Sequence, residues 1–142
     1  MRVVPDTSVL IPALRSSTGA AAEVVRLTLL QELTILMDYK LACEYRAVPL
    51  RAEHLSTSGK TREEMELLLD MLEAVAEPIM VSVRHRPFSP DADDDMVLDV
   101  AISGNADAIV SNNTRHFREP AERFRLGLLR PAEVLSEYRK RS

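Results

Sequence analysis

The chain alternates short apolar runs with segments whose apolar residues recur at helical intervals. Runs that are typical of buried strands occur at residues 3–4, 33–37, 79–83, 108–110 and 126–129. Helical spacing or helix-start signals occur after residue 6, at residues 20–32, at about 39–48, at 61–77, after 91–95 and from 131 onward. Strands that alternate with helices predict an α/β sandwich around a mostly parallel sheet.

Local signals sharpen two of these helices. Thr61 and Glu64 form a capping box at the start of the helix at 61–77, and residues 56–60 before it are expected to be a loop. The apolar side of this helix belongs either to the core, which is the commoner case, or to a dimer surface. Pro131 is well placed as the first residue of the C-terminal helix.

Polar residues stand where the predicted strands end. Asp6 follows the first strand, Asn112 and Asn113 follow the strand at 108–110, and Asp95 begins the helix before that strand. Glu44 lies on a helix that follows the second strand. Ligands of open parallel sheets gather at the carboxyl ends of the strands, so these residues are expected to converge on one edge.

Length and composition describe an ordinary globular chain. A length of 142 residues predicts a single domain spanning residues 1–142. No apolar run approaches the roughly 20 residues of a membrane span, and Asp6 interrupts the region where a signal peptide needs apolar residues. Cys43 is the only cysteine, which excludes an internal disulfide and suits a reducing cytoplasm.

Charge is distributed unevenly. The net charge of −4 argues against a protein that coats nucleic acid by bulk electrostatics. Residues 1–113 carry 10 basic and 18 acidic residues, whereas residues 114–142 carry 8 basic and 4 acidic residues. An acidic centre beside a basic segment could hold metal ions and a phosphate backbone together. A tail helix with a solvated charged face explains the same counts, so charge alone leaves both interpretations open.

The run DADDD at residues 91–95 is the most unusual feature of the sequence. A helix dipole stabilises N-terminal acids by only about 0.3–1 kcal/mol each, which accounts for one or two of the four carboxylates. A calcium loop would need Gly and Glu where this chain has Met96 and Ile102, so that interpretation fails. Hard oxygen ligands without a His or Cys cluster favour magnesium or manganese.

Each remaining candidate has an ordinary structural explanation when it is taken alone. Asp6 could cap the following helix, Glu44 could be a solvated surface residue, and Asn113 could belong to a turn. His116 has no sequence partner that would support a role as general base, and it is interpreted as a surface or phosphate-contacting residue. The other histidines, His54 and His85, have no ligand-like spacing with it, so zinc is not expected.

Four segments together resemble the PIN-domain family of nucleases. They are VVPDTSVLIPAL at 3–14, LACEYRAV at 41–48, PDADDDMVLDVAISGNADAIVSNNTRHF at 90–117 and RPAEVL at 130–135. The third segment is similar to a bacterial and archaeal branch that is often described as toxins of toxin–antitoxin pairs. The resemblance implies a three-layer α/β/α sandwich with a central, mostly parallel sheet.

The same resemblance assigns roles residue by residue. Asp6 matches the family's first acid, Glu44 the second and Asp95 the third, which makes them the expected metal ligands and catalytic residues. Asp94 is the register alternative for the third acid, ahead of Asp93. The ligands would hold Mg²⁺ or Mn²⁺, which polarises the scissile phosphate and lowers the pKa of a bound water.

The fourth acidic position of the family is occupied here by Asn113. Its carbonyl oxygen can coordinate a metal but adds no negative charge, so a second metal is expected to bind more weakly. Ser8 and Ser111 match small hydroxyl positions that line the family's site. The candidate phosphate contacts are Arg115, Arg118, Arg123 and Arg125.

The implied function is hydrolysis of single-stranded RNA by a metal-dependent endoribonuclease, the toxin of a pair with an antitoxin partner, which forms a homodimer. The alternative is a PIN-like module with weakened catalysis that binds RNA or a protein partner. A phosphatase with Asp6 as its nucleophile is a third interpretation, and it lacks the second Asp two residues later, where Ser8 stands.

Overall fold

A computed structural model describes residues 1–81 and 92–142, except the side chains of residues 92 and 93. Five strands form one sheet in the order β3-β2-β1-β4-β5. Every pair of neighbouring strands is parallel. The strands are β1 (Arg2–Pro5), β2 (Thr34–Met37), β3 (Glu77–Pro78), β4 (Ala108–Val110) and β5 (Gly127–Leu129).

The strand order reverses direction at β1. The chain adds β2 and β3 on one side of β1, and then returns to place β4 and β5 on the other side. Val3 pairs with both Ile35 and Ala108, and Pro5 pairs with Val110 at the carboxyl end. In sheets of this order, ligands bind outside the carboxyl ends of the strands at the reversal point. Here that point is the end of β1 and β4.

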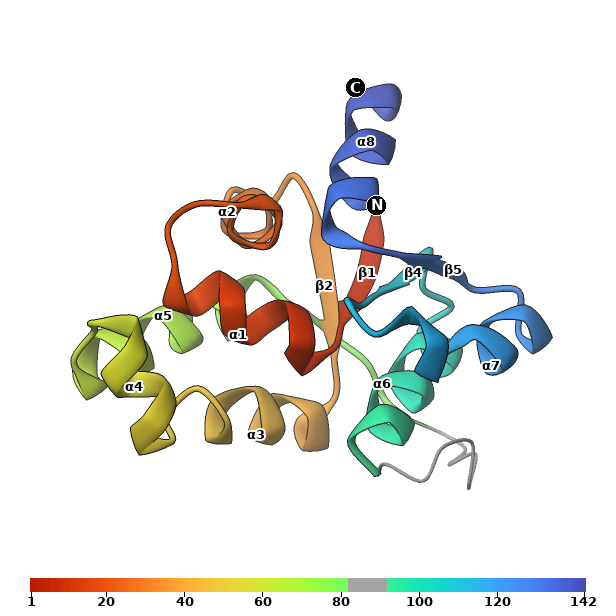
Figure 1. Ribbon diagram of the computed structural model, residues 1–142. Helices are drawn as coiled ribbons and strands as arrows, with labels where there is room; N and C mark the ends of the chain where they lie inside the picture. Colours follow the sequence, from red (N-terminus) through yellow and green to blue (C-terminus); the bar gives the residue numbers. More distant parts are fainter. Residues whose placement is uncertain (82–91) are drawn as a thin grey trace.

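Helices cover both faces of the sheet (Figure 1). Helices α1 (Thr7–Arg15) and α2 (Ala20–Leu29) lie on one side of the sheet, and α6 (Ala92–Ser103) lies on the other. The expected three-layer α/β/α sandwich is therefore confirmed, and its sheet is wholly parallel. The remaining helices are α3 (Tyr39–Ala47), α4 (Ala52–Ser58), α5 (Arg62–Val75), the 3₁₀ turn η1 (Thr114–His116), α7 (Arg118–Arg123) and α8 (Pro131–Arg141).

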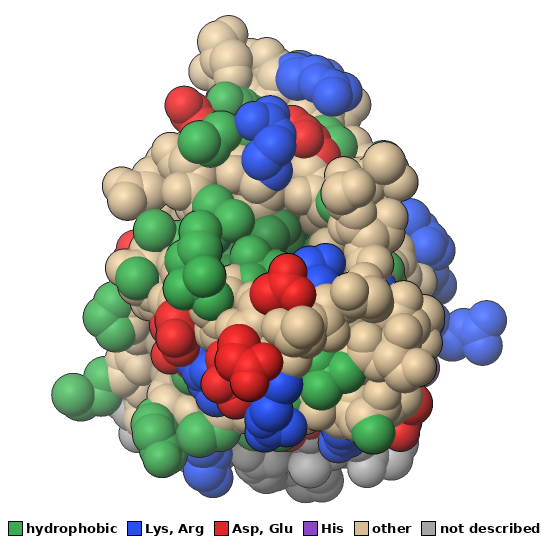
Figure 2. Space-filling model, turned by 90° about the vertical axis from the view of Figure 1, so that its left-hand side faces the viewer, with side chains coloured by type: hydrophobic (Ala, Val, Ile, Leu, Met, Phe, Trp, Pro, Cys, Tyr) green, Lys and Arg blue, Asp and Glu red, His purple; other side chains and the backbone are tan. Residues whose placement is uncertain are grey.

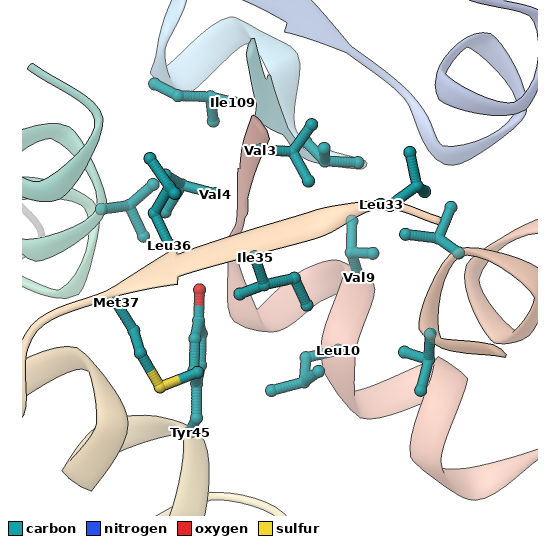
Figure 3. Close-up of a cluster of buried hydrophobic side chains, with 14 of the residues drawn as sticks. Val3, Val4, Val9, Leu10, Leu33, Ile35, Leu36, Met37, Tyr45 and Ile109 are labelled. Carbon is teal, nitrogen blue, oxygen red and sulfur yellow. The ribbon is translucent and has the colours of Figure 1, made fainter. Parts of the chain in front are cut away.

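The core is built from aliphatic side chains on both faces of the central strands. Val3 and Val4 of β1 are fully buried, as are Leu36 of β2 and Ile109 of β4. Consecutive residues are buried because a parallel sheet is covered on both faces. Figure 3 shows these side chains on either side of β1 and β2. None of the described helices has both the length and the apolar character that a membrane span requires.

The third strand lies two residues earlier than the sequence predicted. The apolar run at 79–83 was expected to form it, but the strand is Glu77–Pro78, and residues 82 and 83 lie outside the described residues. Glu77 and Pro78 pair with the last two residues of β2, and the amide of Ile79 donates to the carbonyl of Met37. β2 ends at Met37, so residues 80 and 81 have no partner strand beside them.

The loop expected at 56–60 is partly helical. Helix α4 continues to Ser58, and the hydroxyls of Thr57 and Ser58 donate back to the carbonyls of Glu53 and Leu55. Hydroxyls of Ser and Thr can donate to the carbonyl of a residue one turn earlier, so these polar residues are accommodated within a helix. The helix ends at Gly59, whose φ of 71° lies in the left-handed region that glycine adopts without strain. The capping box at Thr61 and the start of α8 at Pro131 are both confirmed.

Candidate active site

Asp6 lies at the reversal point of the sheet. It directly follows β1, and its amide donates to the carbonyl of Val110 at the end of β4, over 3.0 Å. The residue is only 6% exposed. It occupies the position before the first residue of α1, yet its side chain makes no capping hydrogen bond to that helix. Capping is therefore not the main engagement of Asp6: the backbone amides of Ser8 and Val9 help to lower its pKa, but both carboxylate oxygens accept serine hydroxyls.

Two serine hydroxyls hold the Asp6 carboxylate. Ser8 donates to Oδ1 over 2.5 Å, and Ser111 donates to Oδ2 over 2.6 Å. The amide of Asn112 donates to the Ser8 hydroxyl at 3.0 Å, and the amide of Asn113 donates to the Ser111 hydroxyl at 2.8 Å. An amide N–H can only donate, so both hydroxyl oxygens accept there and direct their hydrogens at Asp6. We call Ser8 and Ser111 the serine clamp.

Burial and the serine clamp act on Asp6 in opposite directions. Burial raises the pKa of the Asp6 carboxyl above its ordinary value, and the hydroxyls of Ser111 and Ser8 offset only part of that rise. The clamp thus stabilises the charged form of a carboxylate that has lost its water. A cation beside it would offset the remaining desolvation cost, because an opposite charge at short range favours ionisation.

Tyr45 joins helix α3 to the end of β1. Its buried hydroxyl donates to the carbonyl of Pro5, the residue before Asp6. Figure 3 shows its ring extending from α3 toward the strands. Burial, together with the charge of Asp6, raises the pKa of Tyr45 well above its ordinary value, so it remains a neutral donor. Glu44 precedes Tyr45 and is half-buried, so this anchor brings the helix that carries Glu44 to β1.

Helix α6 contributes buried carboxylates from its first two turns. Asp94 and Asp95 are 7% and 3% exposed. Oδ2 of Asp94 lies 3.3 Å from Nδ1 of His116, which gives that histidine the partner that the sequence did not reveal. Asp99, one turn beyond Asp95, is fully buried. Asp91 and the side chain of Asp93 lie outside the described residues.

A basic hollow opens beside the serine clamp. Its volume is about 360 Å³, and its wall includes Asn112, Asn113 and the residues Thr114, Arg115, His116, Arg118 and Arg130. Arg130 donates to the carbonyl of Asn112 at 3.2 Å. Arg123 and Arg125 do not line this hollow, and Arg123 instead pairs with Glu119 at 2.5 Å. The structure thus separates the four predicted phosphate contacts into two pairs.

The elements that carry the predicted ligands contact one another, but the ligand side chains do not form a closed cluster within the described residues. Helix α6 contacts β1, β4 and α3, so the elements that carry Asp6, Glu44 and Asp95 touch one another. Within the described part of the chain, no three His, Cys, Asp or Glu side chains are grouped so that they could hold a metal ion. The donors are oxygen atoms, which in chemical type fit a hard divalent cation.

The family comparison agrees with this fold. Residues 2–115 match the family model described as a PIN domain, which is more than half of the chain. The chain belongs to the PIN-domain family. PIN domains are generally nucleases and typically use divalent metal ions. No curated protein matches the chain.

Two residues near the site of this PIN domain were not predicted from the sequence. Asp99 follows Asp95 by four residues, and this spacing places both on one face of a helix, which was the available signal. Arg130 follows β5 directly, so it stands at the carboxyl end of a strand like Asp6 and Asn113. The rule that located the acidic residues would have located this arginine too.

Proposed function

We propose that this PIN domain is a metal-dependent endoribonuclease that hydrolyses phosphodiester bonds of single-stranded RNA. The observation that carries the proposal is the buried Asp6 carboxylate, which accepts the hydroxyls of Ser8 and Ser111 beside an arginine-lined hollow. Carboxylate oxygens bind a hard cation, and arginines bind phosphate. One edge of the sheet therefore offers both chemistries that phosphodiester hydrolysis requires.

The proposed ligands are Asp6, Glu44 and Asp95, with Asp94 as the alternative to Asp95. A bound Mg²⁺ or Mn²⁺ would offset charge on the scissile phosphate and acidify a water. The serine clamp keeps Asp6 in one orientation, because each of its oxygens accepts a hydroxyl hydrogen. Each oxygen retains lone-pair capacity for a cation, since a carboxylate oxygen can accept more than one partner.

Cleavage of labelled RNA tests this proposal directly. Purified protein is incubated with end-labelled single-stranded RNA in Mg²⁺, in Mn²⁺ and in EDTA. We expect internal cleavage with either metal, none in EDTA, and none with Asp6→Asn. Ser136→Ala, at an exposed helix position, is the matched control and should cleave like the parent. Cleavage that survives Asp6→Asn would come from a contaminant and would refute the proposal.

A binding module with weakened catalysis is the second candidate. Asn113 favours it, because this residue supplies no negative charge where the family has a fourth acid. The lack of a three-carboxylate cluster among the described residues favours it as well. In this case, the cleavage assay would be negative in both metals, while the same RNA, or a co-purifying protein, would still bind.

We further propose that the protein acts in the cytoplasm as the toxin of a toxin–antitoxin pair and forms a homodimer. Exposed apolar side chains support a protein partner: Leu67 and Met71 of α5 are 61% and 45% exposed, and Leu30 at the end of α2 is 58% exposed. Figure 2 views this side of the molecule, where hydrophobic side chains gather around a hollow. Light scattering of the purified protein tests the dimer, and an adjacent gene for a small DNA-binding protein would support the antitoxin.

A further inference from the structure

The basic hollow concentrates positive charge on an acidic protein. The chain carries a net charge of −4, yet the hollow is lined by three arginines and no acidic residue. The arginines come from two separate segments: Arg115 and Arg118 follow β4, and Arg130 follows β5. A concave site with one sign of charge focuses the field on whatever enters it.

The guanidinium groups of this hollow are not engaged by carboxylates. Within the described residues, Arg115 and Arg118 have no ion pair, and the guanidinium of Arg130 donates to the neutral carbonyl of Asn112, while only its backbone amide donates to Glu133. Elsewhere, Arg2, Arg26, Arg46 and Arg62 each pair with a glutamate or aspartate. Arg15, Arg51, Arg125 and Arg139 also have no ion pair among the described residues, but Arg115, Arg118 and Arg130 line the same hollow beside the serine clamp. Guanidinium donors bind phosphate oxygens in a bidentate manner.

Asn112 connects the hollow to the serine clamp. Its carbonyl accepts from Arg130, its amide donates to the Ser8 hydroxyl, and its side-chain amide donates to the carbonyl of Ser8 at 2.9 Å. Ser8 in turn donates to Asp6. A phosphate in the hollow would thus border Asn112, which bonds directly to the serine that holds the candidate ligand.

We propose that the hollow lined by Arg115, Arg118 and Arg130 is a subsite for a single RNA backbone phosphate next to the scissile one. The inference rests on the proposed function, because it takes the bond near Asp6 as the one that is cleaved. Arg130 spans the gap between the two segments and sets the register of the strand. The nucleotide bases do not enter into this recognition, since the contacts are to phosphate oxygens.

Phosphate-by-phosphate neutralisation tests the subsite. A single-stranded oligonucleotide is prepared as a series in which one phosphate at a time is replaced by a neutral methylphosphonate. Binding is measured by fluorescence anisotropy in EDTA, so that cleavage plays no part. We expect one position at which neutralisation weakens binding to the parent protein by roughly tenfold. In Arg130→Gln and in Arg118→Gln, neutralising the phosphate at that position should cause no further loss of binding affinity.

Arg123→Gln is the matched control. It removes the same charge from α7, but from a side chain that pairs with Glu119 outside the hollow. The Arg123→Gln variant should lose as much binding affinity as the parent does when the phosphate at that position is neutralised. For Arg130→Gln, the slope of log affinity against log salt should fall by about 0.7 per lost contact. Equal sensitivity at all phosphates, or equal losses in Arg123→Gln and Arg130→Gln, would overturn the subsite.

Two further measurements, competition with inorganic phosphate and a comparison of binding with cleavage, separate this inference from its alternatives. Inorganic phosphate added as competitor should displace the oligonucleotide only weakly; displacement at micromolar phosphate would instead assign the hollow to free phosphate and overturn the RNA subsite. The binding pattern does not depend on catalysis. A position-specific binding pattern without any cleavage in Mg²⁺ would refute the proposed nuclease activity and support the subsite. Cleavage without a position-specific binding pattern would support the nuclease activity and refute the subsite.

Discussion

The Ser111 hydroxyl donates to Oδ2 of Asp6 over 2.6 Å, a bond between residues 105 positions apart in sequence. Both residues follow the carboxyl ends of neighbouring parallel strands, β4 and β1. The amide of Asn113 fixes the direction of this hydroxyl by donating to its oxygen. Ser111 is fully buried.

Ser111→Ala is therefore expected to destabilise the fold. It leaves an Asp6 oxygen without its hydroxyl donor and the Asn113 amide without its acceptor, and an unsatisfied buried group costs about 1–3 kcal/mol. Urea unfolding at pH 7 in EDTA should show a loss of this size. Ser136→Ala changes the same side chain at an exposed position and should be neutral. Equal stabilities of the two variants would mean that the clamp bond contributes nothing.

The alternation of apolar runs with helical segments predicted an α/β sandwich around a mostly parallel sheet, and the family resemblance implied its three layers; both are confirmed. The sequence could not predict the serine clamp. The bond from Ser8 to Asp6 is local, but the bond from Ser111 depends on the register between β1 and β4, which brings Pro5 opposite Val110. The partner of His116 also depends on tertiary structure, since Asp94 lies on another helix. β3 was misplaced because the end of β2, not the apolar run, decides where it pairs.

Gly127→Ala should destabilise the sheet. A Cβ at Gly127 would lie 2.6 Å from the backbone oxygen of Asp107, and backbone at the β4–β5 junction cannot move aside without breaking the pairing of Ala108 with Gly127. Overpacking of this kind costs about 1–3 kcal/mol. Gly104→Ala is the comparison, because its two nearest neighbours, at 2.9 Å, are the side-chain ends of Ile79 and Leu36, and its nearest backbone atom, the oxygen of Val100, lies farther away at 3.0 Å. Its midpoint in urea should fall less than that of Gly127→Ala.

The Arg2–Glu77 ion pair predicts a pH-dependent contribution to stability. Arg2 donates to both carboxylate oxygens of Glu77 and lowers the pKa of that carboxyl below its ordinary value. The folded state therefore binds its proton less readily than the unfolded state. The stabilisation is complete above the ordinary pKa of 4.5, and it is lost as the pH falls through the lowered folded value.

Glu77→Gln tests that contribution. The side chains are 35% and 40% exposed, so solvent screening limits the loss at pH 7 to about 0.2–1 kcal/mol. The difference from the parent should shrink toward zero when urea unfolding is repeated at pH 3. Glu53→Gln, for which the described residues provide no ion pair, should show no difference at either pH. A Glu77→Gln deficit that persists unchanged at pH 3 would assign its cause to packing instead.

Asn113→Asp restores the charge that the fourth position of the family carries. The Asn113 backbone amide, not its side chain, holds Ser111, so the substitution leaves the serine clamp intact. In EDTA, we expect lower stability, because a second carboxylate is added near Asp6. In Mg²⁺, we expect a larger rise in melting temperature than for the parent, and faster RNA cleavage. A variant that loses stability in EDTA without gaining more from Mg²⁺ would show that position 113 does not face the metal.

The effect of Mg²⁺ on melting temperature can decide whether Asp95 or Asp94 is the metal ligand. A metal that binds only the folded state stabilises it, by about 2.7 kcal/mol at a concentration one hundred times its dissociation constant. We expect Asp95→Asn to abolish the Mg²⁺-dependent rise in melting temperature, as Asp6→Asn should. Asp94→Asn should retain the rise, because Asp94 already faces His116 at 3.3 Å. His116→Gln removes that contact without touching a carboxylate and serves as the control. Loss of the metal response in Asp94→Asn, with its retention in Asp95→Asn and His116→Gln, would transfer the ligand role to Asp94.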